Sequence, residues 1–482
     1  MLSPTDARDH NAGTSRHPQL WRVLAERAEE AEYAILRTDM EPNSLSSMLA
    51  FRECAHEQFS RRADALFEML DALLVLPSAT APAHMMLLPG FQRRWGSVYD
   101  ALVAGRIDTT GIEDLVAHYP LDGGESVYAV DSSTWMKNDA ETSPQRGYYH
   151  HHNRHSAGKP IVAGWSYQWL AQVSFRHDSW CAPLAAQRVE PTDNVQQVAA
   201  TQIRALLQRH SAKGEVPIFV FDAGYDAIQL AQLLDELPIA LLVRLKSNRC
   251  FYAKPAEGPT GGHPRWHGDK FIFRDAQTWG GPLYECLLND VQYGQVHIQA
   301  WPEMHAKPDH HMTRGTYQPR PVIPGTLLRI TVTKLPKQTG MPKPLWLWWH
   351  GPSLPNLERI WQAYRARFQQ EHFFKFAKYQ LNWTTPRLRH PEQADRWTQL
   401  VLLAYTMIRL ARPLVADQRL PWERPRENGK LTPYRVRRAL SLLVPSLPRV
   451  INPPKPCGRS PGRRKGVKSG PAPRYPAIKK SA

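Results

Sequence analysis

The spacing of hydrophobic residues changes along this chain, and each change predicts a different kind of element. Residues 17–118 carry apolar side chains at helical spacing, as in "SSMLAFRECAHEQFSRRADALFEMLDALLVL", and predict an N-terminal helical region. From residue 126 the apolar runs become short or alternating, which is typical of strands. The first three strand candidates are "SVYAVDSSTW", "KPIVAGWSYQWLAQVSF" and "WCAPLAAQRVEP".

Two helical patterns then alternate with two further strands. "TDNVQQVAATQIRALLQRH" and "AIQLAQLLDEL" have helical spacing, whereas "VPIFVFDAGYD" and "IALLVRLKSN" are apolar enough to be buried strands. The order of elements is therefore strand-strand-strand-helix-strand-helix-strand. This order predicts an α/β fold with a mixed sheet flanked by helices.

Residues 252–345 interrupt the pattern with a segment dense in Gly, Pro, Trp and His. A structureless loop of this length inside a compact domain is improbable, so the strand candidates "KFIFRDA", "LYECLLNDV", "QVHIQAW" and "TLLRITVTKL" predict an inserted, mostly β subdomain. A long helix is predicted over residues 355–380. A second apolar helix, "RWTQLVLLAYTMIRLAR", follows it.

Charge narrows the choice of partner. The formal net charge of +17 and the pI of about 9.7 favour nucleic acid over a merely solvated basic surface. From residue 428 onward there are fourteen Lys or Arg and no Asp or Glu, and the last thirty residues predict a disordered phosphate-binding arm. The pairs Arg61–Arg62 and Arg93–Arg94 fit a DNA-binding helical domain or a solvated helical surface equally well.

Cysteine usage and hydropathy indicate the compartment. The five cysteines are scattered without a CxxC pair, which predicts reduced thiols and no zinc site. No apolar run is long enough to cross a membrane and no secretory signal is recognisable, so a cytoplasmic, nucleoid-associated protein with no membrane partner is expected.

Two predicted strands end in an acid, and these acids are candidates for chemistry. Asp131 follows "VYAV", Asp222 follows "IFVF", and a third acid, Glu371, lies on the helix beyond the insertion. Carboxylates that converge at a sheet edge suit Mg²⁺, and two such ions can activate water and stabilise the leaving oxygen of a phosphodiester. A strand-terminal Asp is also a common turn former or helix cap, and Asp139 and Asp226 are nearby competitors.

The third acid belongs to an ordered stripe in "YRARFQQEHFFKFAK". Tyr364, Arg367, Glu371 and Lys378 are separated by three, four and seven residues. At about 100° per residue these positions fall within an arc of roughly 60° on one helix. One helix face thus carries a phenol, a guanidinium, a carboxylate and an ammonium.

This stripe resembles the "YREK" signature of bacterial insertion-sequence DDE transposases, and all four positions match. The resemblance spans residues 120–412 and implies an RNase H-like core in which Asp131, Asp222 and Glu371 hold two Mg²⁺ ions, for which Mn²⁺ can substitute. It also implies that Tyr364, Arg367 and Lys378 contact the DNA near the cleaved phosphate. One departure is "DAGYD", which keeps Tyr225 but lacks the Arg that often follows the second Asp.

A histidine-rich run, "YYHHHNRH", lies between the first two predicted strands. Adjacent histidines without a Cys partner are poorly spaced for zinc. The alternatives are a loop near Asp131 whose Arg154 and Lys159 face DNA phosphates, and a merely solvated loop.

The expected function is that of a DDE transposase. It would bind the terminal inverted repeats of its element, hydrolyse a phosphodiester at each end and join the 3′ ends to target DNA as a homodimer on DNA. The alternatives are an RNase H-like nuclease without strand transfer and a DNA-binding protein with relic acids. The predicted domains are a helical DNA-binding domain at 1–120, a catalytic core at 121–251 and 346–412, the β insertion at 252–345 and a basic, partly disordered region at 413–482.

Overall fold

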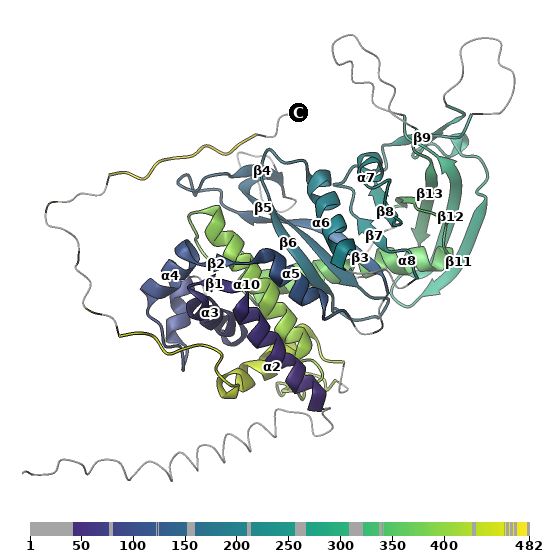
Figure 1. The fold of residues 1–482 in the computed structure, drawn as a ribbon. Coiled ribbons are helices and arrows are strands. Elements are labelled where there is room, and N and C mark those ends of the chain that lie inside the picture. Colours follow the sequence, from purple (N-terminus) through teal and green to yellow (C-terminus); the bar gives the residue numbers. More distant parts are fainter. Residues whose placement is uncertain are drawn as a thin grey trace, which may run out of the picture.

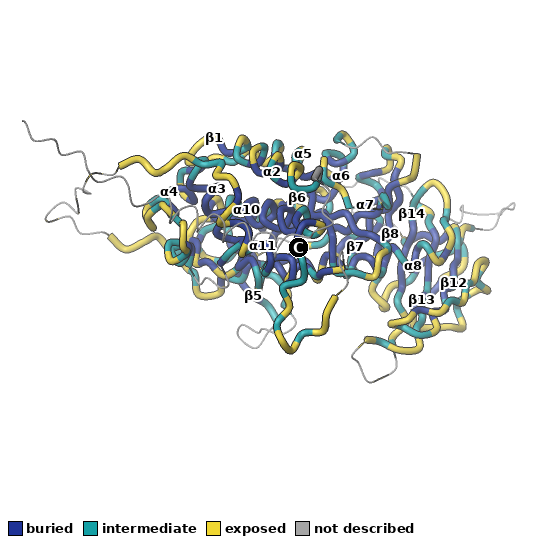
Figure 2. Tube along the Cα trace, turned by 90° about the horizontal axis from the view of Figure 1, so that it is seen from below, coloured by how far each residue is buried: buried dark blue, intermediate teal, exposed yellow. Residues whose placement is uncertain are grey.

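The protein has a helical part and a sheet part that lie side by side (Figure 1). The computed structural model describes residues 42–76, 81–121, 123, 125–151, 160–209, 214–255, 267–307, 322–336, 340, 342–426, 430–456, 458, 462, 466 and 470–479. Within this part of the chain, no helix is both long and apolar enough to span a bilayer. The buried residues form one continuous band from the helices into the sheet (Figure 2).

The helical part is built from segments that precede and follow the sheet in the sequence. Its elements are α2 (Pro42–Glu57), β1 (Phe59–Arg61), α3 (Ala63–Val75), η1 (Pro82–Leu87), α4 (Trp95–Ala104), β2 (Arg106–Ile107), α5 (Thr109–Ala117), α10 (Pro391–Leu410), α11 (Pro433–Leu443) and η3 (Val444–Ser446). Helix α10 is apolar on nearly all sides, so it is buried along most of its length. It packs against α2, α3, α4, α5 and α11, and also against the sheet through β6.

The sheet part contains a ten-stranded mixed sheet. Its strands are β3 (Val127–Met136), β4 (Gly147–His150), β5 (Ile161–Val173), β6 (Ala182–Val189), β7 (Ile218–Phe221), β8 (Ala240–Leu245), β11 (Tyr284–Asp290), β12 (Gly294–Met304), β13 (Gly325–Val332) and β14 (Leu345–His350). Their order is β11-β12-β13-β14-β8-β7-β3-β5-β4, with β6 also paired to β5. Strands β3, β7 and β8 run parallel, and the other pairs are antiparallel.

Helices cover both faces of this sheet. On β5, Gln168 hydrogen-bonds to Gln202 of α6 (Val195–Arg209) at 2.9 Å, whereas the ring of Trp169 packs against Phe373 of α9 (Phe368–Tyr379). Because successive strand residues point to opposite faces, α6 and α9 lie on opposite sides of β5. Helices α7 (Ala227–Leu233) and α8 (Leu357–Ala366) contact β8 and β7. The predicted α/β class, with an RNase H-like mixed sheet flanked by helices, is confirmed.

The predicted β insertion contributes strands to the main sheet. Strands β11, β12 and β13 pair in sequence and reach the core through β14, which pairs with β8. Strands β9 (Cys250–Tyr252) and β10 (Lys270–Ile272), next to η2 (Ala276–Thr278), form a separate two-stranded hairpin. The domain boundaries drawn from the sequence stay predictions.

Two expectations differ from the structure. The helix predicted over residues 355–380 is interrupted at Arg367, where the Gln370 N–H donates to the Arg367 carbonyl in a tighter turn, so α8 and α9 are separate.

Disorder was expected throughout the last thirty residues, yet residues 470–479 include hydrogen-bonded backbone. The Tyr475 N–H donates to the Glu141 carbonyl and the Ile478 N–H to the Arg146 carbonyl, and Ile478 forms a parallel bridge with Gly147, the first residue of β4.

Candidate active site

The register of two parallel strands brings the first two acids together. Val130 of β3 is paired with Phe221 of β7, and each is followed directly by an acid, Asp131 and Asp222. Paired residues on adjacent strands are about 5 Å apart and point to the same face. The two carboxylates are therefore neighbours beside the carboxyl end of β7. Asp222 follows its strand as expected, but Asp131 does not end β3, because the strand continues to Met136 in its pairing with β5.

Helix α9 covers this pair of acids. Asp131 is paired with Trp169 of β5, so both side chains face the same side of the sheet. The Trp169 ring contacts Phe373 and Phe374 of α9 with centroid separations of 5.0 and 6.4 Å. The aromatic residues thus hold α9, and with it Glu371, over Asp131.

Arg367 joins the first and third acids. Its Nη1 lies 3.2 Å from Asp131 Oδ2, and its Nη2 lies 2.7 Å from Glu371 Oε1. The Arg367 side chain is only 3% exposed, whereas that of Glu371 is 47% exposed. Burial acts to lower the pKa of Arg367, but Tyr364 and the three acids outweigh it and raise that pKa. The guanidinium therefore stays charged between two carboxylates.

Asp131 is the acid whose ionisation is most disturbed. Burial raises the pKa of Asp131 to about 6, Arg367 opposes this rise, and the charges of Asp222 and Glu371 add to it. The Ser132 N–H donates to Asp131 Oδ1 at 2.8 Å and favours the charged form. The crowding of three carboxylates makes this position favourable for additional positive charge.

Asp222 has a cationic partner that the sequence did not reveal. Arg244 of β8 lies 3.2 Å from Asp222 Oδ1, and both side chains are partly exposed. In the transposases that the sequence resembles, an Arg often follows the second acid, and this chain lacks it. Arg244 on the neighbouring strand β8 places a cation beside Asp222 instead. A charged residue inside the otherwise apolar run "IALLVRL" was the available signal. The competitor Asp226 instead caps α7, accepting from the N–H groups of Ile228 and Gln229.

Tyr364 and Lys378, which were also predicted to contact DNA, lie beside Arg367 and near Trp383. Tyr364 is 4% exposed and its ring lies 5.8 Å from the Arg367 guanidinium. Lys378 is partly buried, 5.9 Å from the centre of the Trp383 ring. Burial lowers the pKa of Lys378, and the charge of Asp131 opposes this shift. Arg154 and Lys159 lie outside the described residues.

The donor set has the chemistry that a hard divalent ion requires. Asp131, Asp222 and Glu371 offer carboxylate oxygens, the ligands that Mg²⁺ and Mn²⁺ prefer. Among the residues that the structure describes, no group of three or more His, Cys, Asp or Glu is arranged as a ready-made metal site. The positively charged Arg367 side chain lies between Asp131 and Glu371, as a metal ion held by these two acids would.

A comparison with protein families supports this picture of the core. The model of the family described as DDE superfamily endonuclease matches residues 54–308, which is more than half of the chain. The chain belongs to the DDE superfamily endonucleases. Proteins of this superfamily act on DNA and typically use divalent metal ions. A search of curated proteins returned no match.

The match covers part of the site of this endonuclease. It includes Asp131 and Asp222 together with the strands that carry them, and it ends before Glu371. The third acid and the Tyr364, Arg367 and Lys378 positions lie beyond it. Their roles stay predictions, argued from the geometry around α8 and α9.

Proposed function

We propose that this endonuclease is a transposase. It binds the terminal inverted repeats of its element, hydrolyses a phosphodiester at each end and joins the freed 3′ ends to target DNA. The observation that carries the proposal is the Arg367 bridge, which ties an acid of the matched family core to Glu371 on a helix outside that match. A homodimer on DNA is part of the proposal, because two ends have to be held together.

Asp131, Asp222 and Glu371 are proposed as the ligands of the divalent ions. When bound, the ions supply Lewis-acid stabilisation and an activated water for phosphodiester cleavage. Arg367 has to release the Asp131 and Glu371 oxygens if the same oxygens are to bind an ion. A freed guanidinium offers a bidentate fork that matches a phosphate, so Arg367 is proposed to move from carboxylate to DNA.

Tyr364, Lys378, Arg154 and Lys159 are proposed as further DNA contacts. Tyr364 supports the Arg367 side chain from beneath, so its effect on DNA is expected to act partly through the guanidinium. The charges of Lys378 and Asp131 interact, and the Lys378 ammonium is proposed to add a point charge for the DNA phosphate beside Asp131. Arg154 and Lys159 are assigned from the sequence alone.

A cleavage and strand-transfer assay tests the function. A duplex carrying the end of the element is incubated with the protein and Mg²⁺ or Mn²⁺, and nicked and joined products are separated by size. We expect Glu371→Gln to lose both products by several orders of magnitude. Glu358→Gln, which alters an exposed carboxylate in the first turn of α8, is the matched control and is expected to behave like the wild type.

The outcomes separate the alternatives. Cleavage without joined products would favour a nuclease that does not transfer strands. DNA binding without either product, in wild type and variant alike, would favour a DNA-binding protein with relic acids. If Glu371→Gln cleaves and joins as well as the wild type, the assignment of the third acid is wrong.

A further inference from the structure

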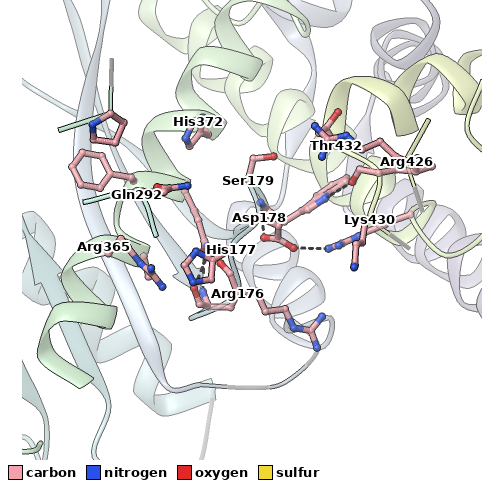
Figure 3. Close-up of a pocket in the computed structure, with 18 of the residues that line it drawn as sticks. Arg176, His177, Asp178, Ser179, Gln292, Arg365, His372, Arg426, Lys430 and Thr432 are labelled. Carbon is pink, nitrogen blue, oxygen red and sulfur yellow. Dashed lines mark hydrogen bonds and ion pairs between the residues drawn. The ribbon is translucent and has the colours of Figure 1, made fainter. Parts of the chain in front are cut away.

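A basic groove lies on another flank of α9 from Glu371. It has a volume of about 1260 Å³ and is formed by the segment after β5, the α8–α9 junction, the β11–β12 turn and the segment before α11 (Figure 3). The three proposed catalytic acids do not line it. Its lining contains five Arg or Lys side chains against one carboxylate, Asp178, together with two histidines, and these cations are Arg176, Arg365, Arg412, Arg426 and Lys430.

Side-chain hydrogen bonds from α9 hold the segment after β5 in place at the floor of this groove. Gln369 of α9 is 4% exposed, and its Nε2 donates to the carbonyls of Ser174 and Arg176 at 2.9 and 3.0 Å. The Ser174 N–H donates back to Gln369 Oε1 at 2.9 Å. These bonds fix the backbone that presents Arg176 and His177, both of which are exposed.

The four arginines of the groove fall into two kinds. Arg412 is engaged with Asp178 at 3.1 Å, and Arg365 with the buried Asp290 at 2.9 Å. In contrast, Arg176 and Arg426 are exposed, and neither guanidinium meets a carboxylate within the part of the chain that the structure describes. Among the described residues, Arg176 and Arg426 therefore give the groove positive charge that no carboxylate neutralises.

We propose that this groove binds the sugar–phosphate backbone of a DNA strand. The charge excess matches a row of phosphates, and exposed guanidinium groups bind phosphate with charge-assisted hydrogen bonds. Residues 371 and 372 are consecutive on α9, so a strand whose phosphate reaches Glu371 can continue around the helix past His372 into the groove. This inference rests on the proposed function in taking DNA as the partner, and it adds a second contact surface beside the acids.

The test measures binding without catalysis. Fluorescence anisotropy with labelled DNA is carried out with chelator present and in a Glu371→Gln background, over a range of salt concentrations. The groove variant is Arg176→Gln/Arg426→Gln. The matched control is Lys270→Gln/Arg274→Gln, which removes the same charge from two exposed residues in and just after β10 that do not line the groove.

We expect the groove variant to bind on the order of tenfold more weakly than its parent. The slope of log affinity against log salt should also fall by about two, because about one unit is lost for each phosphate contact removed. The control should keep the slope of the parent. Equal losses in both double variants, or no loss in the groove variant, would overturn the proposal.

Two DNA forms distinguish the source of the backbone. Binding of a single strand and of a duplex of the same sequence is compared. Weaker binding of either form by the groove variant supports binding of the sugar–phosphate backbone, which both forms share. The removed side chains are exposed, so an unchanged unfolding temperature is expected and serves as the check on folding. If cleavage and joining fail but the groove effect holds, the proposed transposase function fails and the groove survives; the reverse result overturns the groove alone.

Discussion

At the residue scale, Arg367 links stability and chemistry in one side chain. Its guanidinium is buried and bridges two carboxylates from β3 and α9. The sequence indicated the acids because an Asp that follows an apolar run and a four-residue spacing are local features, although β3 continues past Asp131 to Met136. It did not predict the bridge, since that contact depends on how α8 and α9 meet at Arg367 and on how α9 packs against β5.

Removing Arg367 is expected to destabilise the metal-free fold. Arg367→Ala leaves the mostly buried Asp131 carboxylate without its partner, which costs on the order of 3 kcal/mol in the free energy of unfolding. Asp131→Asn added to this variant should restore part of the loss, because the neutral amide no longer needs a counter-charge. A double-mutant cycle by urea unfolding measures the coupling. Strictly additive effects of the two substitutions would show that the pair does not interact.

Lys137 predicts a pH dependence of stability away from the acids. Its Nζ donates to the Leu388 carbonyl at 2.8 Å and lies near the Trp135 and Trp165 rings. Burial lowers the pKa of Lys137 from 10.5 to about 8, with a smaller contribution from Arg387. Between these values the unfolded chain binds more protons than the fold does, so stability attributable to Lys137 rises with pH.

The measurement compares wild type with Lys137→Met. Between pH 8 and pH 10 the free energy of unfolding of the wild type should rise on the order of 2 kcal/mol relative to the variant. Lys375→Met removes an exposed lysine of α9 and should leave the pH dependence unchanged. A fall in the wild-type stability relative to Lys137→Met over this interval would contradict the prediction.

At the element scale, α9 is shared between two surfaces. Glu371 faces the acids of the sheet, Gln369 holds the segment after β5, and Phe373 packs against Trp169. The periodicity of the sequence predicted a helix here with a polar stripe and packing aromatics. The interruption at Arg367 was missed because Arg is a good helix former, so nothing local in the sequence indicates the break.

Gln369 holds the segment after β5 through three hydrogen bonds, here called the Gln369 clamp, and this clamp gives a prediction at the scale of the element. Gln369→Leu leaves three backbone groups of the segment after β5 without their side-chain partner, and buried unsatisfied groups cost about 1–3 kcal/mol each. We expect stability lower by on the order of 3 kcal/mol, faster amide exchange at Ser174 and weaker DNA binding through a displaced Arg176. Gln362→Leu, in α8, alters a glutamine that bonds only the side chain of Glu358 among the described residues and is the control. An unchanged exchange rate at Ser174 would contradict the clamp.

At the scale of the whole molecule, helices from before and after the sheet in the sequence meet in one helical layer. Arg437 of α11 donates to the carbonyls of Leu73 and Leu76 in and after α3, and Arg396 of α10 donates to the Leu102 and Gly105 carbonyls. The sequence predicted the helices and the strand order of the core, because both follow from periodicity. It could not predict that α10 and α11 pack with the first helices, or that the insertion extends the main sheet, since these pairings are not local.

The net charge of the molecule leads to the final prediction, on the basic segment near the C-terminus. Substituting five cations by Gln removes five of the positive charges behind the formal net charge of +17, and these residues are Arg459, Arg463, Arg464, Lys465 and Lys468. The exchange leaves intact residues 470–479, which bond to Glu141 and Arg146. Because phosphate contacts carry no sequence information, affinity and its salt dependence should fall equally for element-end and unrelated duplexes. A chain with the same five cations in shuffled order should bind like the wild type, whereas a changed preference between the two duplexes would show that this segment reads sequence.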